Sequence, residues 1–287
     1  MFKKIHTPLV GVLLFLSTFN TFSQDITEPT RYTATNKGKF FVSWGGNRAA
    51  FTKSDITFKG VDYNFTIKEV TAEDKPKGWH IDYINPTRIT IPQTNFKLGY
   101  FISDNYSIAL GMDHMKYVMP ADKMRMVDGY INLPSNDVGS VFNGGYHNQN
   151  LLISEDFLQF EHTDGLNYVY LEFARHDDIS SIFNIQNTDK FQINITEGIG
   201  AGVLYPKTNT TLFGRDRYDE FHVSGYGLSI AAGLNLTFFK HFFIQGDLRG
   251  GYINMGNIRT TRNASEGASQ YFFFGESVFS LGGKFRI

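Results

Sequence analysis

Residues 221–238 read FHVSGYGLSIAAGLNLTF, and this stretch decides the class of fold. From Tyr226 to Phe238 every even-numbered residue is apolar, and every odd-numbered residue is glycine, alanine or a small polar residue. A period of two is that of a β-strand whose two faces meet different surroundings. The large apolar side chains share one face, as in a wall with hydrocarbon outside and a narrow polar lumen inside. A soluble barrel would reverse that polarity, so the stretch predicts a membrane-spanning strand.

Seven other segments show the same alternation. They cover residues 38–48, 94–103, 106–113, 166–176, 190–205, 241–253 and 270–287. The chain is therefore predicted to be all-β and to form an antiparallel up-and-down transmembrane barrel of eight strands. Residues 57–70 and 124–132 are also extended in character, and they would raise the number to ten or twelve strands if they entered the membrane. Neither segment has an apolar face long enough to cross the membrane, so we expect the two long loops to hold their own β-hairpins at these places.

The connections between these segments alternate between long and short. Residues 49–93 and 118–165 make two long connections, whereas 104–105 and 239–240 are tight turns. Membrane barrels of this kind have short turns on the periplasmic side and long loops outside the cell. We therefore expect both ends of the mature chain in the periplasm and the two long connections on the extracellular side.

The start of the chain has the features of an export signal. Lys3 and Lys4 precede an apolar run over 8–19, and Thr21 and Ser23 have the spacing of a signal peptidase site. We expect a cleaved signal peptide over 1–23, a short periplasmic segment over 24–37 and the barrel over 38–287. No later stretch of 18 apolar residues could make a membrane helix, so any span must be a strand.

Charge and cysteine content narrow the function classes. The formal net charge is −1, which gives no electrostatic case for a nucleic-acid partner. The sequence has no cysteine, so it is not a disulfide-stapled secreted domain. Phe and Tyr number 28 and 15, a content that suits many half-apolar strands better than a helical enzyme.

The last ten residues, VFSLGGKFRI at 278–287, alternate apolar and polar residues to the end of the chain. With the other strands they make the chain similar to the small Gram-negative outer-membrane barrels of the OmpA-like and OmpX-like kind. The resemblance implies an integral outer-membrane protein in contact with lipid and lipopolysaccharide. It also implies recognition of the last strand by the barrel-assembly machinery. That signal usually ends in Phe, whereas here Ile287 is last and Phe285 lies two residues before it.

Charged residues occur on the inward face of the predicted strands. An eight-stranded barrel is only wide enough inside for its own side chains, so these residues are expected to fill the lumen rather than line a pore. Buried charges persist when they are paired. We therefore predict an interior ion-pair network of Lys97, Asp113, Glu172, Asp247, Arg249, Glu276 and Lys284.

His222 and Ser224 raise the possibility of catalysis. Their spacing resembles the His-x-Ser pair of the outer-membrane lipid A deacylases of the PagL kind, in which a Glu orients the His. The Asn expected after the Ser is Gly225 here, and Glu197 lies about five residues too deep on the neighbouring strand. Glu197 also interrupts an apolar face, and we expect a β-bulge beside the following glycines. Exposed rim positions are the default interpretation of His222 and Ser224.

Two other groups of polar residues lie in or beside the outer connections. Asp113, His114, Asp156, Glu161, His162 and Asp164 match no recognised metal spacing, so neither a metal nor a cofactor is predicted. Arg215, Arg217, Arg259 and Arg262 are cationic rim residues that could meet lipopolysaccharide phosphates.

The sequence thus predicts a non-enzymatic surface protein in which loops 49–93 and 118–165 bind a ligand or partner. One alternative is an outer-leaflet lipid A hydrolase that uses His222 and Ser224. The other is a narrow channel or transporter, which requires more than eight strands in the barrel.

Overall fold

The computed structural model describes residues 35–78, 80–84 and 92–287. The predicted signal peptide at 1–23 and most of the predicted periplasmic segment lie outside these residues. No helix in the described ranges is long and apolar enough to cross a membrane.

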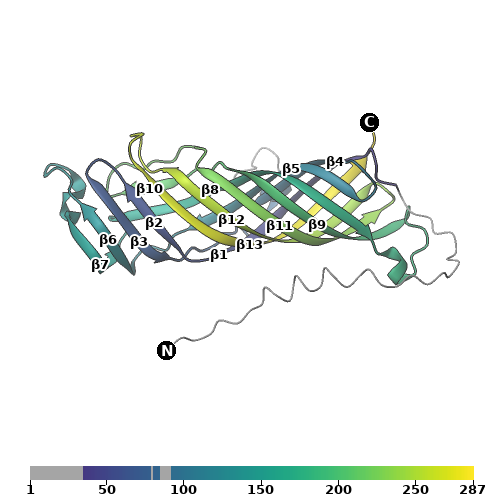
Figure 1. Cartoon of the computed structure of the whole chain (residues 1–287), viewed down its shortest axis with the longest axis horizontal. Coiled ribbons are helices and arrows are strands. Elements are labelled where there is room, and N and C mark those ends of the chain that lie inside the picture. Colours follow the sequence, from purple (N-terminus) through teal and green to yellow (C-terminus); the bar gives the residue numbers. More distant parts are fainter. Residues whose placement is uncertain (1–34, 79, 85–91) are drawn as a thin grey trace, which may run out of the picture. The chain divides into compact units, whose positions relative to one another are not determined.

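Eight antiparallel strands close into a ring (Figure 1), as the alternation predicted. Each strand pairs with the next, and the first and last strands pair to complete the ring. The ring consists of β1 (Phe40–Phe51), β4 (Thr94–Phe101), β5 (Tyr106–Val118), β8 (Leu158–Asp178), β9 (Phe191–Leu204), β11 (Gly225–Phe238), β12 (Phe242–Arg259) and β13 (Gly267–Phe285). The predicted segments all coincide with these strands, but β5, β8 and β12 run further on the extracellular side than the alternation indicated.

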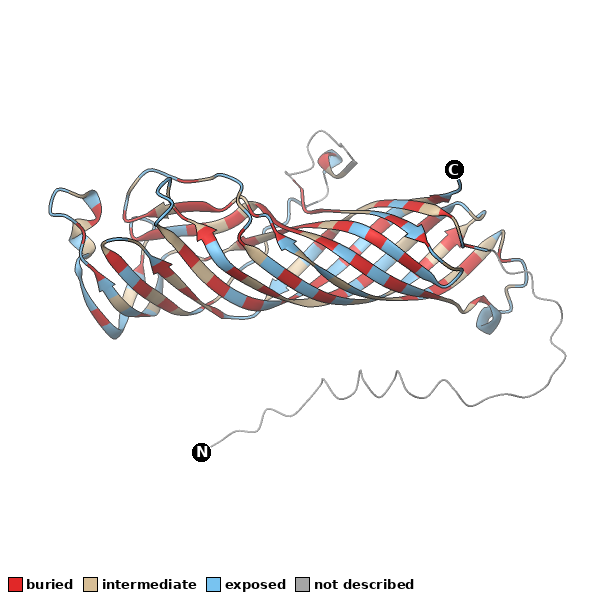
Figure 2. Cartoon of the chain, turned by 45° about the horizontal axis from the view of Figure 1, so that its top comes forward, coloured by how far each residue is buried: buried red, intermediate tan, exposed pale blue. Residues whose placement is uncertain are grey.

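The two faces of the wall differ as expected. Figure 2 shows buried and exposed residues alternating along the strands. On β11, Leu228 and Ile230 are more than half exposed, whereas Ser229 and Asn235 are buried. At the end of the wall with the short turns, outward rings pack together across neighbouring strands. These contacts are Phe285–Phe40–Tyr100, Tyr106–Phe173 and Phe191–Phe238. They form the aromatic girdle of a membrane interface.

The two long connections fold into a β-sheet outside the ring. It consists of β2 (Ser54–Lys59), β3 (Tyr63–Val70), β6 (Lys123–Ile131) and β7 (Gly144–Ile153), which continue the sheet in the order β13-β2-β3-β6-β7. A short strand, β10 (Asn209–Leu212), pairs with the outer end of β8. Because the long connections are expected on the extracellular side, we call this set of strands, with the outer ends of β8, β12 and β13, the extracellular extension. The predicted hairpins within the long connections are confirmed: 57–70 holds most of the β2–β3 hairpin, and 124–132 coincides with β6, which forms a hairpin with β7. These strands pair outside the ring instead of adding strands to it.

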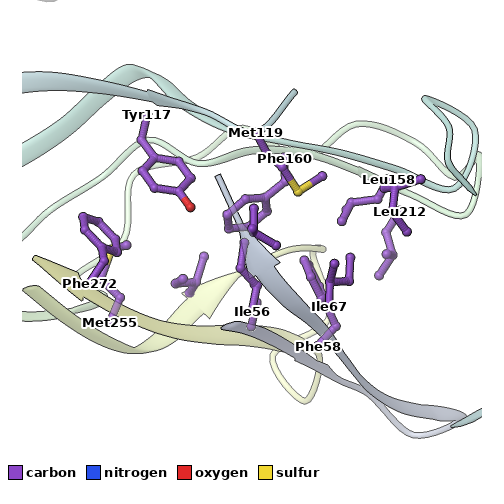
Figure 3. Close-up of a cluster of buried hydrophobic side chains, with 14 of the residues drawn as sticks. Ile56, Phe58, Ile67, Tyr117, Met119, Leu158, Phe160, Leu212, Met255 and Phe272 are labelled. Carbon is purple, nitrogen blue, oxygen red and sulfur yellow. The ribbon is translucent and has the colours of Figure 1, made fainter. Parts of the chain in front are cut away.

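The extracellular extension has a hydrophobic core of its own (Figure 3). Phe58 and Phe65 stack with ring centroids 5.2 Å apart across the β2–β3 hairpin. Phe213, which follows β10, is fully buried and packs against the rings of Tyr63, Phe65 and Phe157. Burial of each such side chain contributes about 1.5–3 kcal/mol. This core explains why the two long connections are folded rather than open loops.

Three short 3-10 helices complete the described chain: η1 (Ile81–Ile84), η3 (Val138–Phe142) and η4 (Ser180–Phe183). η3 begins at Asp137, whose side chain accepts a hydrogen bond of 2.9 Å from the Gly139 amide and so caps the helix. η4 lies in the connection from β8 to β9, on the side of the short turns.

Candidate functional site

Six of the seven predicted lumen charges lie together in the middle of the ring. The Arg249 guanidinium is 2.7 Å from Glu172 and 3.2 Å from Asp113, and it stacks over the Tyr170 ring at 4.4 Å. Glu276 lies 3.9 Å from the same guanidinium. Lys97 is 2.8 Å from Glu172 and 3.7 Å from Asp247. These side chains come from β4, β5, β8, β12 and β13, so the ion pairs link strands on different sides of the lumen.

Lys284, the seventh predicted member, lies elsewhere. Its ammonium group donates to Thr237 over 3.0 Å and lies over the rings of Phe101 and Phe243. Phe41, Phe101 and Phe243 form a small buried aromatic cluster near the ends of β1, β4 and β12. No ion pair among the described residues joins Lys284 to the central charges. The prediction failed here because inward parity alone does not tell how far apart two side chains lie along the lumen.

A continuous series of side-chain contacts follows the lumen from Lys284 to the first long connection. Most of the contacts are hydrogen bonds of 2.5–3.3 Å, and two are the ion pairs of Lys97 with Asp247 and of Arg249 with Asp113. The series runs Lys284, Thr237, Asn235, Gln245, Asp247, Lys97, Glu172, Arg249, Asp113, Asn95, Asn47, Gln93 and Asp74.

A cavity of about 30 Å³ beside Lys97, Glu172 and Asp247 has room for about two water molecules. The ring has eight strands, so the condition that the channel hypothesis required is not met.

Glu197 does not lie at a bulge. The register of β9 with β8 and with β11 runs through it without a shift, so the predicted irregularity was wrong. Arg175 is its partner residue on β8 and has the same outward parity. The guanidinium of Arg175 forms its ion pair with Asp177 at 2.8 Å, whereas Arg175 and Glu197 are cross-strand neighbours only.

His222 and Ser224 do not form a catalytic pair. β11 begins only at Gly225, so both residues precede the regular strand. The Ser224 hydroxyl is buried and donates to the main-chain oxygen of His222, while His222 Nε2 lies 3.0 Å from the Asn257 amide. Glu197 lies opposite Ala232, eight residues further along β11 than Ser224 and thus about 26 Å away along the strand. The arrangement therefore does not support the lipid A hydrolase hypothesis.

The acidic and histidine residues of the second long connection are scattered. Asp113 belongs to the lumen, whereas the buried His162 bonds to Thr208 over 2.9 Å and packs against Tyr117 and Phe160. His114 is buried and contacts Asn167. Glu161 and Asp164 face lysines at the surface. No group of three possible metal ligands occurs among the residues that the structure describes.

The four arginines proposed to contact lipopolysaccharide differ in their surroundings. Arg217 forms an ion pair of 3.2 Å with Asp219 and is about half exposed. Arg259 and Arg262 take part in none of the ion pairs of the described residues. Arg215, in contrast, is largely buried between Asp137 at 2.8 Å and Glu266 at 3.6 Å. Contact with lipopolysaccharide stays a prediction for Arg217, Arg259 and Arg262. The guanidinium of Arg215 is already paired with two carboxylates within the extracellular extension.

The ion pair of Arg215 with Asp137 ties η3 to the segment after β10. The guanidinium holds the pKa of Asp137 below its ordinary value, with smaller help from the Gly139 amide. Asp137 therefore stabilises the extracellular extension above the usual carboxyl pKa, and this stabilisation is lost as the pH falls through the lowered value.

Asp137→Asn keeps the helix cap, because Asn caps as well as Asp, but removes the charge. We expect a loss of about 1–3 kcal/mol at neutral pH and a weaker dependence of stability on pH below about 4. Limited proteolysis of residues 134–157 over a pH series measures both effects. Equal acid sensitivity of the native and Asp137→Asn proteins would show that this pair does not stabilise the extension.

β7 is the free edge of the extracellular sheet: its only strand partner among the described residues is β6. Its sequence, GGYHNQNLLI, contains no charged residue and no proline. The ladder with β6 is interrupted near Asn148, which has a φ of 51°, and is continuous from Gln149 to Ile153. Natural edge strands are usually protected by charge or proline, and β7 lacks both.

The outer face of the sheet turns apolar toward this edge. On β6 and β7, Met124, Met126, Tyr130 and Leu152 are 59%, 43%, 48% and 50% exposed. The same face of β2 and β3 is polar, with a hydrogen bond of Thr57 to Thr66 and an ion pair of Lys68 with Asp55. The sequence does not predict this surface, because β7 shows no alternation and lies within the long connection 118–165.

A closed ring of eight antiparallel strands, apolar outside and joined by short turns at one end and long connections at the other, is the architecture of small outer-membrane barrels. The chain resembles that group of proteins. No family model matches the sequence, and no curated protein matches it either.

Among solved structures, the chain is similar to the attachment invasion locus protein Ail of Yersinia pestis, at 13% identity and a TM-score of 0.33, covering 87% of this chain and 99% of that one. The outer membrane protein OprG of Pseudomonas aeruginosa matches at 10% identity and 0.35, covering 89% and 100%. Neisserial surface protein A matches at 9% and 0.33, covering 88% and 100%. Identities this low assign no activity to the chain.

Proposed function

We propose that this protein is a non-enzymatic outer-membrane surface protein, and that strand β7 binds an extended segment of a partner polypeptide. The free, uncharged edge of β7 carries the proposal, since an extended peptide can add to such an edge through main-chain hydrogen bonds. In this proposal the two long connections form the binding region as a folded sheet rather than as open loops. The barrel anchors that sheet in the membrane.

The apolar face beside the edge supports the same proposal. Met126 lies opposite Asn150 and Met124 opposite Leu152 in the β6–β7 register. A strand added to β7 would place every second side chain on this face, next to Asn150 and Leu152. The partner segment is therefore expected to alternate apolar and polar residues over about five positions, which is the length of the uninterrupted ladder from Gln149 to Ile153.

The test is selection of random linear peptides on the protein held in lipid nanodiscs. We expect selected peptides to have the alternating pattern, and Gln149→Lys to weaken their binding about tenfold or more, or ~1.4 kcal/mol, because a lysine on an edge strand opposes pairing. Thr66→Lys is the matched control, since β3 is paired on both sides. Binding that is unaffected by Gln149→Lys, or no enrichment of extended peptides, would contradict the proposal.

A further inference from the structure

The central charges of the lumen are not balanced. Asp113, Glu172, Asp247 and Glu276 supply four carboxylates, and among the residues that the structure describes only Lys97 and Arg249 oppose them within ion-pair distance. All six residues are buried or nearly so. Since unpaired charge is costly in such surroundings, the excess of negative charge needs a compensation beyond these two cations.

The excess is concentrated at Asp113 on β5 and Glu276 on β13. The Asn95 amide nitrogen lies 2.5 Å from Asp113 Oδ1 and 3.1 Å from Glu276 Oε1, so the two carboxyl groups face the same donor. Their other oxygens, Asp113 Oδ2 and Glu276 Oε2, both face Arg249 Nε, at 3.2 and 3.9 Å. The two carboxyl groups therefore share both a donor amide and a guanidinium nitrogen. Two adjacent carboxylates in a buried site do not both stay ionised.

The two oxygens that face Arg249 are also buried without a hydrogen-bond partner. Buried polar atoms of native proteins are normally satisfied. A hydrogen atom on one carboxyl group, donated to the other, would satisfy both oxygens at once. It would also remove one of the excess negative charges.

We propose that Asp113 and Glu276 share one proton, which is bound to Glu276 Oε2 and donated to Asp113 Oδ2. Asp113 is the ionised partner because it receives the stronger donors: Asn95, the Tyr170 hydroxyl at 3.1 Å and the nearer contact with Arg249. Glu276 has only the longer contacts with Asn95 and Arg249. The other charged groups of the site, Glu172, Lys97 and Asp247, are engaged with each other and with Arg249.

The shared proton joins strands that are not neighbours. β5 and β13 are separated in the ring by β1 and β4 on one side and by four strands on the other. The lumen thus holds a proton-binding site. When the proton is bound, a hydrogen bond links β13 to β5 across the lumen.

Infrared spectroscopy of the protein in lipid nanodiscs tests the proposal. At neutral pH the native protein is expected to show the C=O stretch of a protonated carboxylic acid, shifted in D₂O. Glu276→Gln and Asp113→Asn should each abolish the band, because the remaining carboxylate then has a neutral amide beside it and ionises. Asp247→Asn is the control and should keep the band, since Asp247 faces Lys97.

Two results would overturn the proposal. One is the absence of the band from the native protein; stability that varied with the identity of the monovalent cation would then show that a bound cation balances the charge. The other is a band that persists in both Glu276→Gln and Asp113→Asn. Variants that fold are identified by the gel mobility of the folded barrel. The native spectrum alone decides whether the carboxylic acid band is present, so that result does not depend on any variant.

Discussion

Replacement of Arg249 by methionine is expected to lower the free energy of unfolding of the barrel by about 3–5 kcal/mol, the usual cost of removing one partner of a buried ion pair. Arg249 is 3% exposed and faces Asp113, Glu172 and Glu276. Methionine fills part of the same volume, but it leaves three carboxyl groups with Lys97 as the remaining cation. Urea titration of the protein folded in lipid vesicles, followed by the gel-mobility difference between folded and unfolded barrel, measures the change.

Arg217→Met is the matched control for this prediction. Arg217 also forms ion pairs, with Asp164 and Asp219, but its side chain is 52% exposed. Exposed pairs contribute about 0–1 kcal/mol, so the control should unfold close to the native midpoint. A similar loss in both variants would mean that the lumen pairs stabilise the barrel no more than surface pairs do.

Phe213→Ala is expected to destabilise the extracellular extension by about 3–5 kcal/mol, the range for removing a large buried aromatic side chain. Phe213 is fully buried and packs against four rings, those of Tyr63, Phe65, Phe142 and Phe157. The variant should be cut by protease within the extension, while the gel mobility of the folded barrel persists.

Phe239→Ala separates burial from backbone strain in the same experiment. Phe213 and Phe239 have φ values of 59° and 52°, so both occupy the left-handed region. Phe239 lies in the turn from β11 to β12 and is 67% exposed. Its replacement should leave the protease sensitivity of the extension unchanged. If the two variants behaved alike, packing in the extracellular core would not be the cause.

The barrel wall could be predicted because one local rule governs it. Alternation from Tyr226 to Phe238 identifies the outward face without knowledge of any neighbour, and the same holds for the other seven strands. The predicted strand ends agree less well with the structure on the extracellular side. β8 begins at Leu158 rather than 166, where its neighbours are β10 and the end of β5 rather than lipid. Residues such as His162 there do not follow the hydrocarbon pattern.

The extracellular core and the edge strand could not be predicted in the same way. Tyr63, Phe157 and Phe213 come from three connections, and their contacts depend on how those connections meet. β7 carries Asn148-Gln149-Asn150 in the middle and gives no periodic signal. In the lumen, the identity of the inward charges was visible in the sequence, but their separation along the lumen axis was not. Inward parity therefore groups Lys284 with charges that it does not contact.

Strands β8, β12 and β13 belong both to the membrane ring and to the extracellular extension. A force that pulls on the outer ends of these three strands therefore passes along covalent backbone into the membrane wall. Their ladders with neighbouring strands lie side by side over many residues, such as the pairing of β12 with β13 from Phe242 to Arg259. Tension along such strands loads many hydrogen bonds at once in shear. A partner held at β7, which four residues separate from the start of β8, would thus pull on a strand that runs into the barrel wall.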